Sequence, residues 1–311
     1  RQSFKGKCVT VDDRGFRATW NQPDGGADDL RRNVWLFGGS SMWGSGARDD
    51  YTIASSLSKL LAESFPGVFR VTNMGETGYV STQEVITLLK EIQRGESPHV
   101  VIFYNGVNDT FAILQSARRG VPQNEWNRIR EFNLLNPSRS ADLYAEALRR
   151  TNTYALIEGI QRKVSPARGP ARPATDLAGD RQALVAGLVN VYLANLDAVA
   201  GLAARRNFRY RFYWQPSLFT KRVKSGSEEE REATMTGIRD AFGVVNAGLQ
   251  AAGALARHPD IRDVSDLFGS HAGTVFTDWV HTTEHGNAMI ARRIFEDSRA
   301  LFVQAAAEPR P

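Results

Sequence analysis

A serine, an aspartate and a histidine stand where they could act together on an acyl group. Ser40 follows Val34–Phe37, an apolar run typical of a buried strand, and two glycines that allow a sharp turn. A serine hydroxyl is a poor nucleophile until a base removes its proton. Asp278 precedes His281 by three residues, close enough to hold one ring nitrogen and leave the other facing a serine. These residue types predict nucleophilic catalysis by a Ser-His-Asp triad.

Two further motifs could supply hydrogen-bond donors to the negative charge that develops on a carbonyl oxygen. Gly78 follows a second strand-like run and can present its backbone N–H without a side chain crowding the substrate. Asn108 follows the apolar run Val100–Tyr104 and can add a carboxamide N–H, with the Ser40 amide as a third donor. The Gly-Val-Asn-Asp sequence around Asn108 is also a plausible turn, so a structural role for it stays open.

Other glycine-rich sites fit the segment around Ser40 poorly. A phosphate-binding P-loop ends in Gly-Lys-Ser/Thr, whereas Gly46 is followed by alanine and arginine. The Gly-Ser-Gly sequence that ends at Gly46 lacks the third glycine of a dinucleotide fingerprint. The nucleophile elbow of α/β-hydrolases needs glycine two residues after the serine, where this chain has Met42.

A zinc site formed by His281, His285 and Asp278 is the main alternative at the other end of the chain. The His-Glu-x-x-His arrangement is absent, however, and the sequence from Glu284 is typical of a helix start. Cys8 is the only cysteine, which excludes a multi-cysteine metal site and a disulfide within the chain. We therefore expect no metal and no cofactor.

The elements that must position these residues alternate between strands and helices. The expected strands are Val34–Phe37, Val68–Asn73, Val100–Tyr104, Phe208–Trp214 and a weak one at Arg262–Val264. The expected helices are Thr52–Phe65, Gln83–Arg94, Ala141–Lys163, Asp180–Arg206 and a closing helix at Glu284–Ala307. This alternation predicts a parallel sheet covered by helices on both faces.

The spacing breaks once, between Tyr104 and Phe208, where the gap far exceeds the roughly 10–15 residues of a simple crossover helix. Val164–Thr175 is rich in proline, alanine and arginine and predicts an exposed loop. We interpret the stretch at about 111–206 as a helical insertion on one domain. The charged segment Lys221–Glu232 predicts a solvated loop that leads into a helix.

Composition limits the classes of partner. The 311 residues are 42% apolar, enough for a full core, and the net charge of +5 is spread over scattered basic clusters. A nucleic-acid binder concentrates such charge on one stripe, so we expect no nucleic acid as partner. No run reaches the roughly 18–20 apolar residues of a membrane span. The chain starts at Arg1 rather than Met, so an export signal or membrane anchor before it stays open, and we expect membrane contact only through such an anchor.

Together the four motifs resemble the blocks of the SGNH (GDSL-type) hydrolase superfamily, which contribute a serine, a glycine, an asparagine and an Asp-x-x-His in this order. They fall here on Ser40, Gly78, Asn108 and Asp278 with His281. One departure is a glycine before Ser40, where the first block commonly has aspartate.

The resemblance implies an α/β fold, a flavodoxin-like three-layer α/β/α sandwich with a central parallel sheet of about five strands. Residues 1–32 would then be an N-terminal lead-in and 33–311 the hydrolase domain with its insertion. Gly15-Phe16-Arg17 also resembles the lead-in of extracytoplasmic SGNH proteins of cell-surface polysaccharide systems. An extracytoplasmic location (periplasmic, secreted or membrane-anchored) is therefore the expectation, with a cytoplasmic one left open.

Aromatic residues beside the chemistry suggest the substrate. Trp43, Tyr79 and Trp279 could stack on a sugar ring, although core packing would explain each of them as well. We predict a serine esterase that removes short acyl groups, such as acetyl, from a small molecule or a carbohydrate. Two alternatives stay open: an O-acyltransferase with the same triad, and a catalytically weak polysaccharide-binding component. No oligomeric state follows from the sequence.

Overall fold

The computed structural model describes residues 3–21, 31–116, 120–123, 125, 177–253, 255 and 258–308. One compact unit comprises residues 1–123 and 184–311, and a second comprises 124–183. The second unit lies almost wholly outside the described residues. The predicted helix 141–163 and the predicted loop 164–175 therefore fall outside the described part of the chain.

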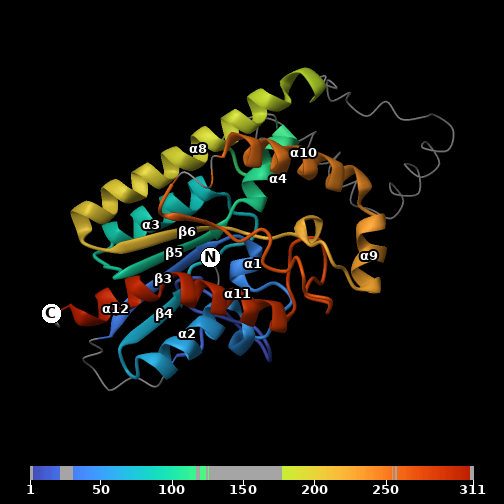
Figure 1. Cartoon of the computed structure of the whole chain (residues 1–311). Coiled ribbons are helices and arrows are strands. Elements are labelled where there is room, and N and C mark those ends of the chain that lie inside the picture. The colour runs from blue at the N-terminus through green and yellow to red at the C-terminus, as the bar shows by residue number, and fades with distance from the viewer. Residues whose placement is uncertain are drawn as a thin grey trace, which may run out of the picture. The chain divides into compact units, whose positions relative to one another are not determined.

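Five parallel strands form the central sheet (Figure 1). They are β3 (Arg32–Gly38), β4 (Phe69–Asn73), β5 (Val100–Asn105), β6 (Arg209–Trp214) and β7 (Ile261–Asp263), and they lie in the order β4-β3-β5-β6-β7. Numbered along the sheet's own strands this is 2-1-3-4-5, the flavodoxin-like order. Every residue of β5 is buried, as expected for a central parallel strand covered on both faces. The predicted fold class and all five predicted strands are confirmed.

Helices cover both faces of the sheet and complete three layers (Figure 1). One face packs on α2 (Ile53–Ser64), α11 (Glu284–Asp297) and α12 (Arg299–Ala307), through a core that includes Leu57, Leu61, Ile290, Ile294 and Phe302. The other face packs on α3 (Ser81–Gln93), α8 (Leu177–Arg206) and part of α10 (Thr236–Ala252), through Leu88, Ile92, Leu196 and Val245 among others. Among the described residues, the remaining helices are α1 (Ser40–Trp43), α4 (Val107–Ser116) and α9 (Gly226–Ala233), with one-turn helices at Asp49–Tyr51 and Leu218–Thr220.

The predicted closing helix is in fact two helices, because the chain breaks at Ser298. The Ser298 hydroxyl lies 2.7 Å from the Tyr213 hydroxyl of β6, and both side chains are buried. Neither proline nor glycine marks this break in the sequence. The break is set by a contact with a distant strand, which a local pattern cannot reveal.

From Val185 onward, helix α8 belongs to the layer of helices on the second face of the sheet. Its buried residues recur at helical spacing and pack on the sheet: Val185, Leu188, Tyr192, Leu196, Val199 and Ala203. By length and composition alone, Ala183–Arg206 is apolar enough to cross a membrane, and the core helix of a soluble protein passes the same test. The helix predicted at Asp180–Arg206 is confirmed. The boundaries predicted at 1–32 and at 111–206 stay predictions.

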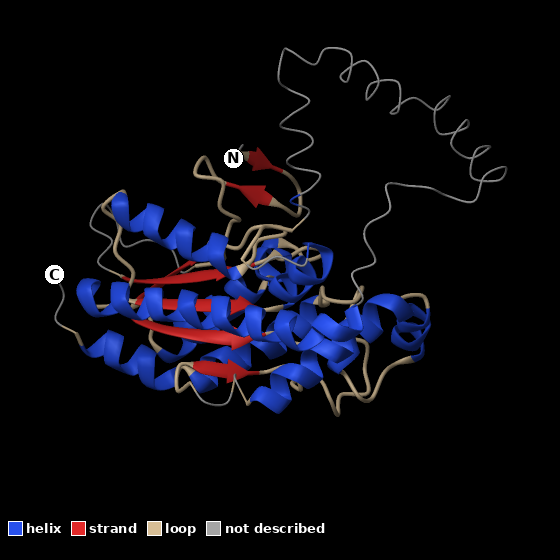
Figure 2. Cartoon of the chain, turned by 90° about the horizontal axis from the view of Figure 1, so that it is seen from above, coloured by secondary structure: helices blue, strands red, loops and turns tan. Residues whose placement is uncertain are grey.

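A small antiparallel ribbon precedes the sheet. Its strands are β1 (Phe4–Lys5) and β2 (Thr10–Val11), and it lies beside the sheet rather than in it (Figure 2). Arg17 then forms an isolated bridge with Asn73 at the end of β4. The lead-in is thereby attached to the carboxyl edge of the sheet.

Candidate active site

The predicted functional residues converge at the carboxyl ends of neighbouring strands. Ser40 begins α1 directly after β3, Gly78 lies between β4 and α3, and Asn108 lies in the first turn of α4 after β5. Strand order reverses between β3 and β5, and such a switch point opens a crevice at the carboxyl edge of an α/β sheet. Ser40 and Asn108 follow the two strands on either side of that point. The topology thus explains why residues so far apart in the chain share one site.

Three side chains form a continuous hydrogen-bonded chain. His281 Nε2 lies 2.7 Å from Ser40 Oγ, and His281 Nδ1 lies 2.5 Å from Asp278 Oδ2. The other carboxylate oxygen, Oδ1, accepts the backbone N–H groups of Val280 and His281 at 2.8 Å each. Burial opposes ionisation of Asp278, but the hydrogen bonds from His281 and Val280 outweigh it and lower the pKa of this carboxyl. An ionised Asp278 holds the proton on Nδ1 and leaves Nε2 able to accept the serine proton.

Asn108 presents its carboxamide to the nucleophile turn. Asn108 Nδ2 donates to the backbone carbonyl of Tyr79 at 2.7 Å, and Asn108 Oδ1 accepts from Gln123 Nε2 at 2.8 Å. A Cβ placed on Gly39 would lie only 2.1 Å from Asn108 Nδ2, so the amide nitrogen lies directly against the residue before Ser40. As the first residue of α1, Ser40 has an N–H without an acceptor inside the helix. Both donors therefore lie beside the serine, as an oxyanion site requires.

Gly78 lies in the loop after β4, the third strand whose end adjoins the site, and its backbone conformation favours glycine. Its φ of +72° lies in the left-handed region that side chains disfavour. Ser81 lies two residues after Tyr79, whose carbonyl accepts from Asn108. The Ser81 N–H and hydroxyl both donate to the Asp109 carboxylate, at 3.1 and 2.5 Å from Oδ1. The contacts of Asn108 and Asp109 thus clamp the Gly78 loop onto α4. The sequence analysis missed Asp109, although its place directly after Asn108 was a signal.

A buried cluster of polar side chains lies near Asp109, which joins α4 to the Gly78 loop. Asn105 Nδ2 donates to Glu84 Oε2 at 2.6 Å, and the Tyr192 hydroxyl donates to Asn105 Oδ1 at 2.8 Å. Glu84 Oε1 is buried without a hydrogen-bond partner. Burial, and then the nearby negative charge of Asp109, raise the pKa of Glu84 well above its ordinary value. Burial also raises the pKa of Asp109, although the hydrogen bonds from Ser81 oppose this, so burial opposes ionisation of both acids.

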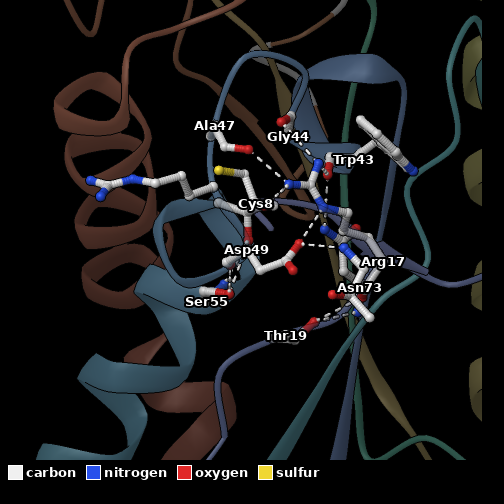
Figure 3. A network of polar contacts seen from close by, with 12 residues as sticks. Cys8, Arg17, Thr19, Trp43, Gly44, Ala47, Asp49, Ser55 and Asn73 are labelled. Atoms are coloured by element: carbon white, nitrogen blue, oxygen red, sulfur yellow. Dashed lines mark hydrogen bonds and ion pairs between the residues drawn. The ribbon is translucent and has the colours of Figure 1, made fainter. Parts of the chain in front are cut away.

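Arg17 binds the loop that follows α1, the helix that Ser40 begins (Figure 3). The Arg17 side chain is fully buried and pairs with Asp49 at 2.7 Å. It also donates to backbone carbonyls just after the nucleophile, those of Gly44 at 3.1 Å and Ala47 at 2.7 Å. Its guanidinium lies 4.4 Å from the ring centroid of Trp43. One face of Trp43 is therefore used for packing, which leaves less of this ring for a substrate than the sequence suggested.

The loop that carries His281 is fixed by a buried ion pair. Lys221 and Glu228 are both fully buried and hydrogen-bond each other, and Lys221 also donates to the Gly273 carbonyl. Glu228 Oε1 accepts the backbone N–H groups of Val275 and Phe276 at 2.9 and 3.0 Å. Although burial opposes it, these donors lower the pKa of Glu228 to about 2. The prediction that the charges of this segment are solvated is wrong for these two residues, which pair with each other and bind backbone groups about 50 residues further along the chain.

The predicted aromatic residues differ in their surroundings. Trp279 is partly exposed and lies within an aromatic cluster, with ring centroids 5.5 Å from Phe111, 5.4 Å from Phe242 and 6.3 Å from Phe219. Tyr79 is partly exposed beside the Asn108 amide. Each lies next in the sequence to a residue of the site, Tyr79 to Gly78 and Trp279 to Asp278. The apolar neighbours of Trp279 come from α4, α10 and the turn after β6, a grouping that spacing along the sequence does not predict.

The fold and the site define a class. A doubly wound parallel sheet with a Ser-His-Asp chain and convergent amide donors at its carboxyl edge is the arrangement of a serine hydrolase. Among the described residues, no group of three or more His, Cys, Asp or Glu side chains is placed to hold a metal ion.

Comparison with known proteins gives remote structural similarity only. No family model and no curated protein matches the chain. A lipolytic protein of the G-D-S-L family from Veillonella parvula has 13% identity and a TM-score of 0.45, over 85% of this chain and 97% of that one. The acetylxylan esterase Axe2 from Geobacillus stearothermophilus has 12% identity and a TM-score of 0.40, over 91% and 98%. The acetyl xylan esterase AlAXEase has 11% identity and a TM-score of 0.44, over 85% and 98%. Similarity this remote leaves the substrate to be inferred from this chain's own residues.

Proposed function

We propose that this protein is a serine esterase of the SGNH type, which hydrolyses short acyl esters, chiefly acetyl esters on a carbohydrate. The observation that carries the proposal is the unbroken chain from Ser40 Oγ through His281 to Asp278, with distances of 2.7 and 2.5 Å. This geometry lies within the range in which a base can take the serine proton. A binding component has no need of such an arrangement.

The reaction has two halves. Ser40 Oγ attacks the ester carbonyl while His281 Nε2 accepts its proton, so that the Oγ–C bond forms and the carbonyl oxygen becomes an oxyanion. The tetrahedral intermediate collapses when His281 returns the proton to the leaving alcohol, and an acyl-serine remains. Water, deprotonated by His281, then releases the acid and restores Ser40. Asp278 keeps the imidazole oriented and stabilises its protonated form.

Donors at the strand ends stabilise the oxyanion. We assign this role to the carboxamide of Asn108 and to the backbone N–H groups of Gly78 and Ser40. One such donor is typically worth about 10²–10³ in rate, roughly 3–4 kcal/mol. No metal or cofactor is needed for these steps, because the protein supplies the nucleophile, the base and the electrophilic donors.

Two aromatic residues support this substrate class. Tyr79 and Trp279 are partly exposed and neighbour Gly78 and Asp278 in the sequence, so their rings could pack on the flat face of a sugar ring while a small acyl group is bound by Ser40. A polysaccharide substrate fits an extracytoplasmic location, which we propose together with it. Nucleic acid has no role in the proposal.

The test is the initial rate of p-nitrophenyl acetate hydrolysis by the wild type and by Ser40→Ala, each with and without a chelator. We expect turnover that the substitution abolishes and the chelator leaves unchanged. Wild-type turnover in Ser40→Ala refutes the serine mechanism. Acetylated xylo- or manno-oligosaccharides then test the substrate class, and acyl transfer to an added sugar that outpaces hydrolysis would replace the esterase with an acyltransferase.

A further inference from the structure

We propose that Gln123 is a positioning residue of the oxyanion site, which fixes the direction of the Asn108 carboxamide. The inference rests on the proposed function, since it assigns a role within the same site. Gln123 stands at the edge of the first compact unit and belongs to none of the motifs that define the triad or its donors.

A carboxamide has two ends of nearly equal shape, and only the nitrogen end can donate to an oxyanion. Two contacts distinguish the ends of Asn108. The Tyr79 carbonyl accepts from Nδ2, and Gln123 Nε2 donates to Oδ1. With Oδ1 held by a donor, the nitrogen end must face the Tyr79 carbonyl and the nucleophile turn. The second hydrogen on Nδ2 remains for the substrate oxygen.

Gln123 adjoins the other donor as well. Its Oε1 lies 3.7 Å from the position that a Cβ on Gly78 would occupy. One side chain therefore borders both Gly78 and Asn108, which come from different strand ends. This places Gln123 where it can set the spacing of the two donors.

The backbone segment that carries Gln123 packs against two helices. Gly120 has a φ of +63°, and a Cβ there would lie 3.2 Å from Val191 of α8 and 3.4 Å from the Thr82 hydroxyl of α3. This close approach holds the start of the segment against two helices of the sandwich. Gln123 thus reaches Asn108 from a fixed backbone.

Gln123→Glu separates positioning from packing. Glutamate has nearly the same shape but, when ionised, only accepts hydrogen bonds. The negative carboxylate of the variant would repel the partly negative Oδ1 of Asn108 and favour rotation of the amide. That rotation turns the oxygen end of Asn108 toward the oxyanion. Gln123→Ala merely removes the donor. Positioning therefore predicts that the glutamate variant is the worse of the two, whereas packing alone predicts the reverse.

The experiment compares kcat and KM for p-nitrophenyl acetate in the wild type, Gln123→Ala, Gln123→Glu and the control Gln304→Glu. Gln304 is exposed on α12, where a carboxylate can still accept from Arg209. We expect kcat to fall about 10-fold for alanine and about 10²-fold for glutamate, approaching the loss of one donor, with KM little changed. The control should match the wild type.

Two further measurements confirm or overturn the proposal. The deficit of Gln123→Glu should shrink as the pH falls toward the ordinary glutamate pKa of about 4.3, because a protonated carboxyl can again donate to Oδ1. In an Asn108→Ala background, both Gln123 substitutions should have no additional effect on kcat. A glutamate variant at least as active as the alanine variant, or full additivity with Asn108→Ala, overturns the positioning role. Ester turnover that persists in Ser40→Ala instead overturns the proposed function.

Discussion

The residue before the nucleophile provides a sharp test of the site, because its missing side chain is what lets Asn108 approach. A Cβ on Gly39 would lie 2.1 Å from Asn108 Nδ2 and 3.2 Å from Asn108 Cγ. Nonbonded heavy atoms prefer a separation of about 3.5–4.0 Å, so Gly39→Ala must displace the carboxamide by roughly 1 Å or more. Asn108 is buried, so the packing around it limits how far its carboxamide can move.

The expected loss follows from that displacement. A misplacement of about 1 Å in a catalytic constellation can cost about 10²-fold in rate. Complete loss of one oxyanion donor costs about 10²–10³, roughly 3–4 kcal/mol. We therefore expect kcat/KM for p-nitrophenyl acetate to fall by about 10²-fold in Gly39→Ala, mainly through kcat. Gly39→Asp, which introduces the residue common in the first block of SGNH hydrolases, should fall at least as far.

The assay needs a control for the effect of any glycine substitution. Gly201 lies in α8 with nothing within 4 Å of an added Cβ, so Gly201→Ala should keep full activity and gain a little stability. Thermal unfolding of each variant shows that the fold persists. If a folded Gly39→Ala retains kcat/KM within about threefold of the wild type, Asn108 does not act where we place it, since one donor is worth more than that.

Three further predictions concern the groups around the site. Asp278→Asn should keep the fold and lower kcat by about 10⁴, the loss known for the equivalent change in a serine protease triad, because the amide no longer holds the required tautomer of His281; near-normal kcat would contradict this. Glu84 has a raised pKa, so the native state keeps a proton that the unfolded chain loses, and this contribution to stability is present at low pH and lost as pH rises through the folded pKa. The free energy of unfolding of Glu84→Gln should consequently depend less steeply on pH above the ordinary glutamate pKa of about 4.3, and equal slopes would refute the raised pKa of Glu84. Lys221→Met leaves the buried Glu228 charge unpaired and should cost about 3–5 kcal/mol in denaturant unfolding, whereas a loss below about 1 kcal/mol would contradict the buried pair.

The sheet and the triad could be predicted because each depends on local signals. Buried parallel strands are short apolar runs, and Val100–Tyr104 was recognisable from its β-branched and aromatic residues alone. Asp278 and His281 are close in sequence, so their contact follows from spacing. The strand ends gave the positions of Ser40 and Asn108, since parallel strands share a carboxyl edge.

The supporting contacts could not be predicted, because they join residues whose separation carries no pattern. Arg17 was recognised in the sequence only as part of the lead-in Gly15-Phe16-Arg17, and its contacts with Asp49 and Ala47 could not be predicted from that resemblance. Lys221 and Glu228 lie within a run of charges that is usually solvated, and only the backbone N–H groups of the histidine loop explain their burial. Gln123 carries no motif. In each case the missing information was a tertiary partner.

The chain order of the triad has a consequence for biosynthesis. Ser40 and His281 are 241 residues apart, so the nucleophile is synthesised well before its base. At a synthesis rate of about 5–20 residues per second, roughly 12–48 s separate the appearance of the two residues from the ribosome. A nascent or prematurely terminated chain therefore carries the serine without its activating base. Ser40 therefore gains its base only once the segment that carries His281 has been synthesised and has packed against the sheet.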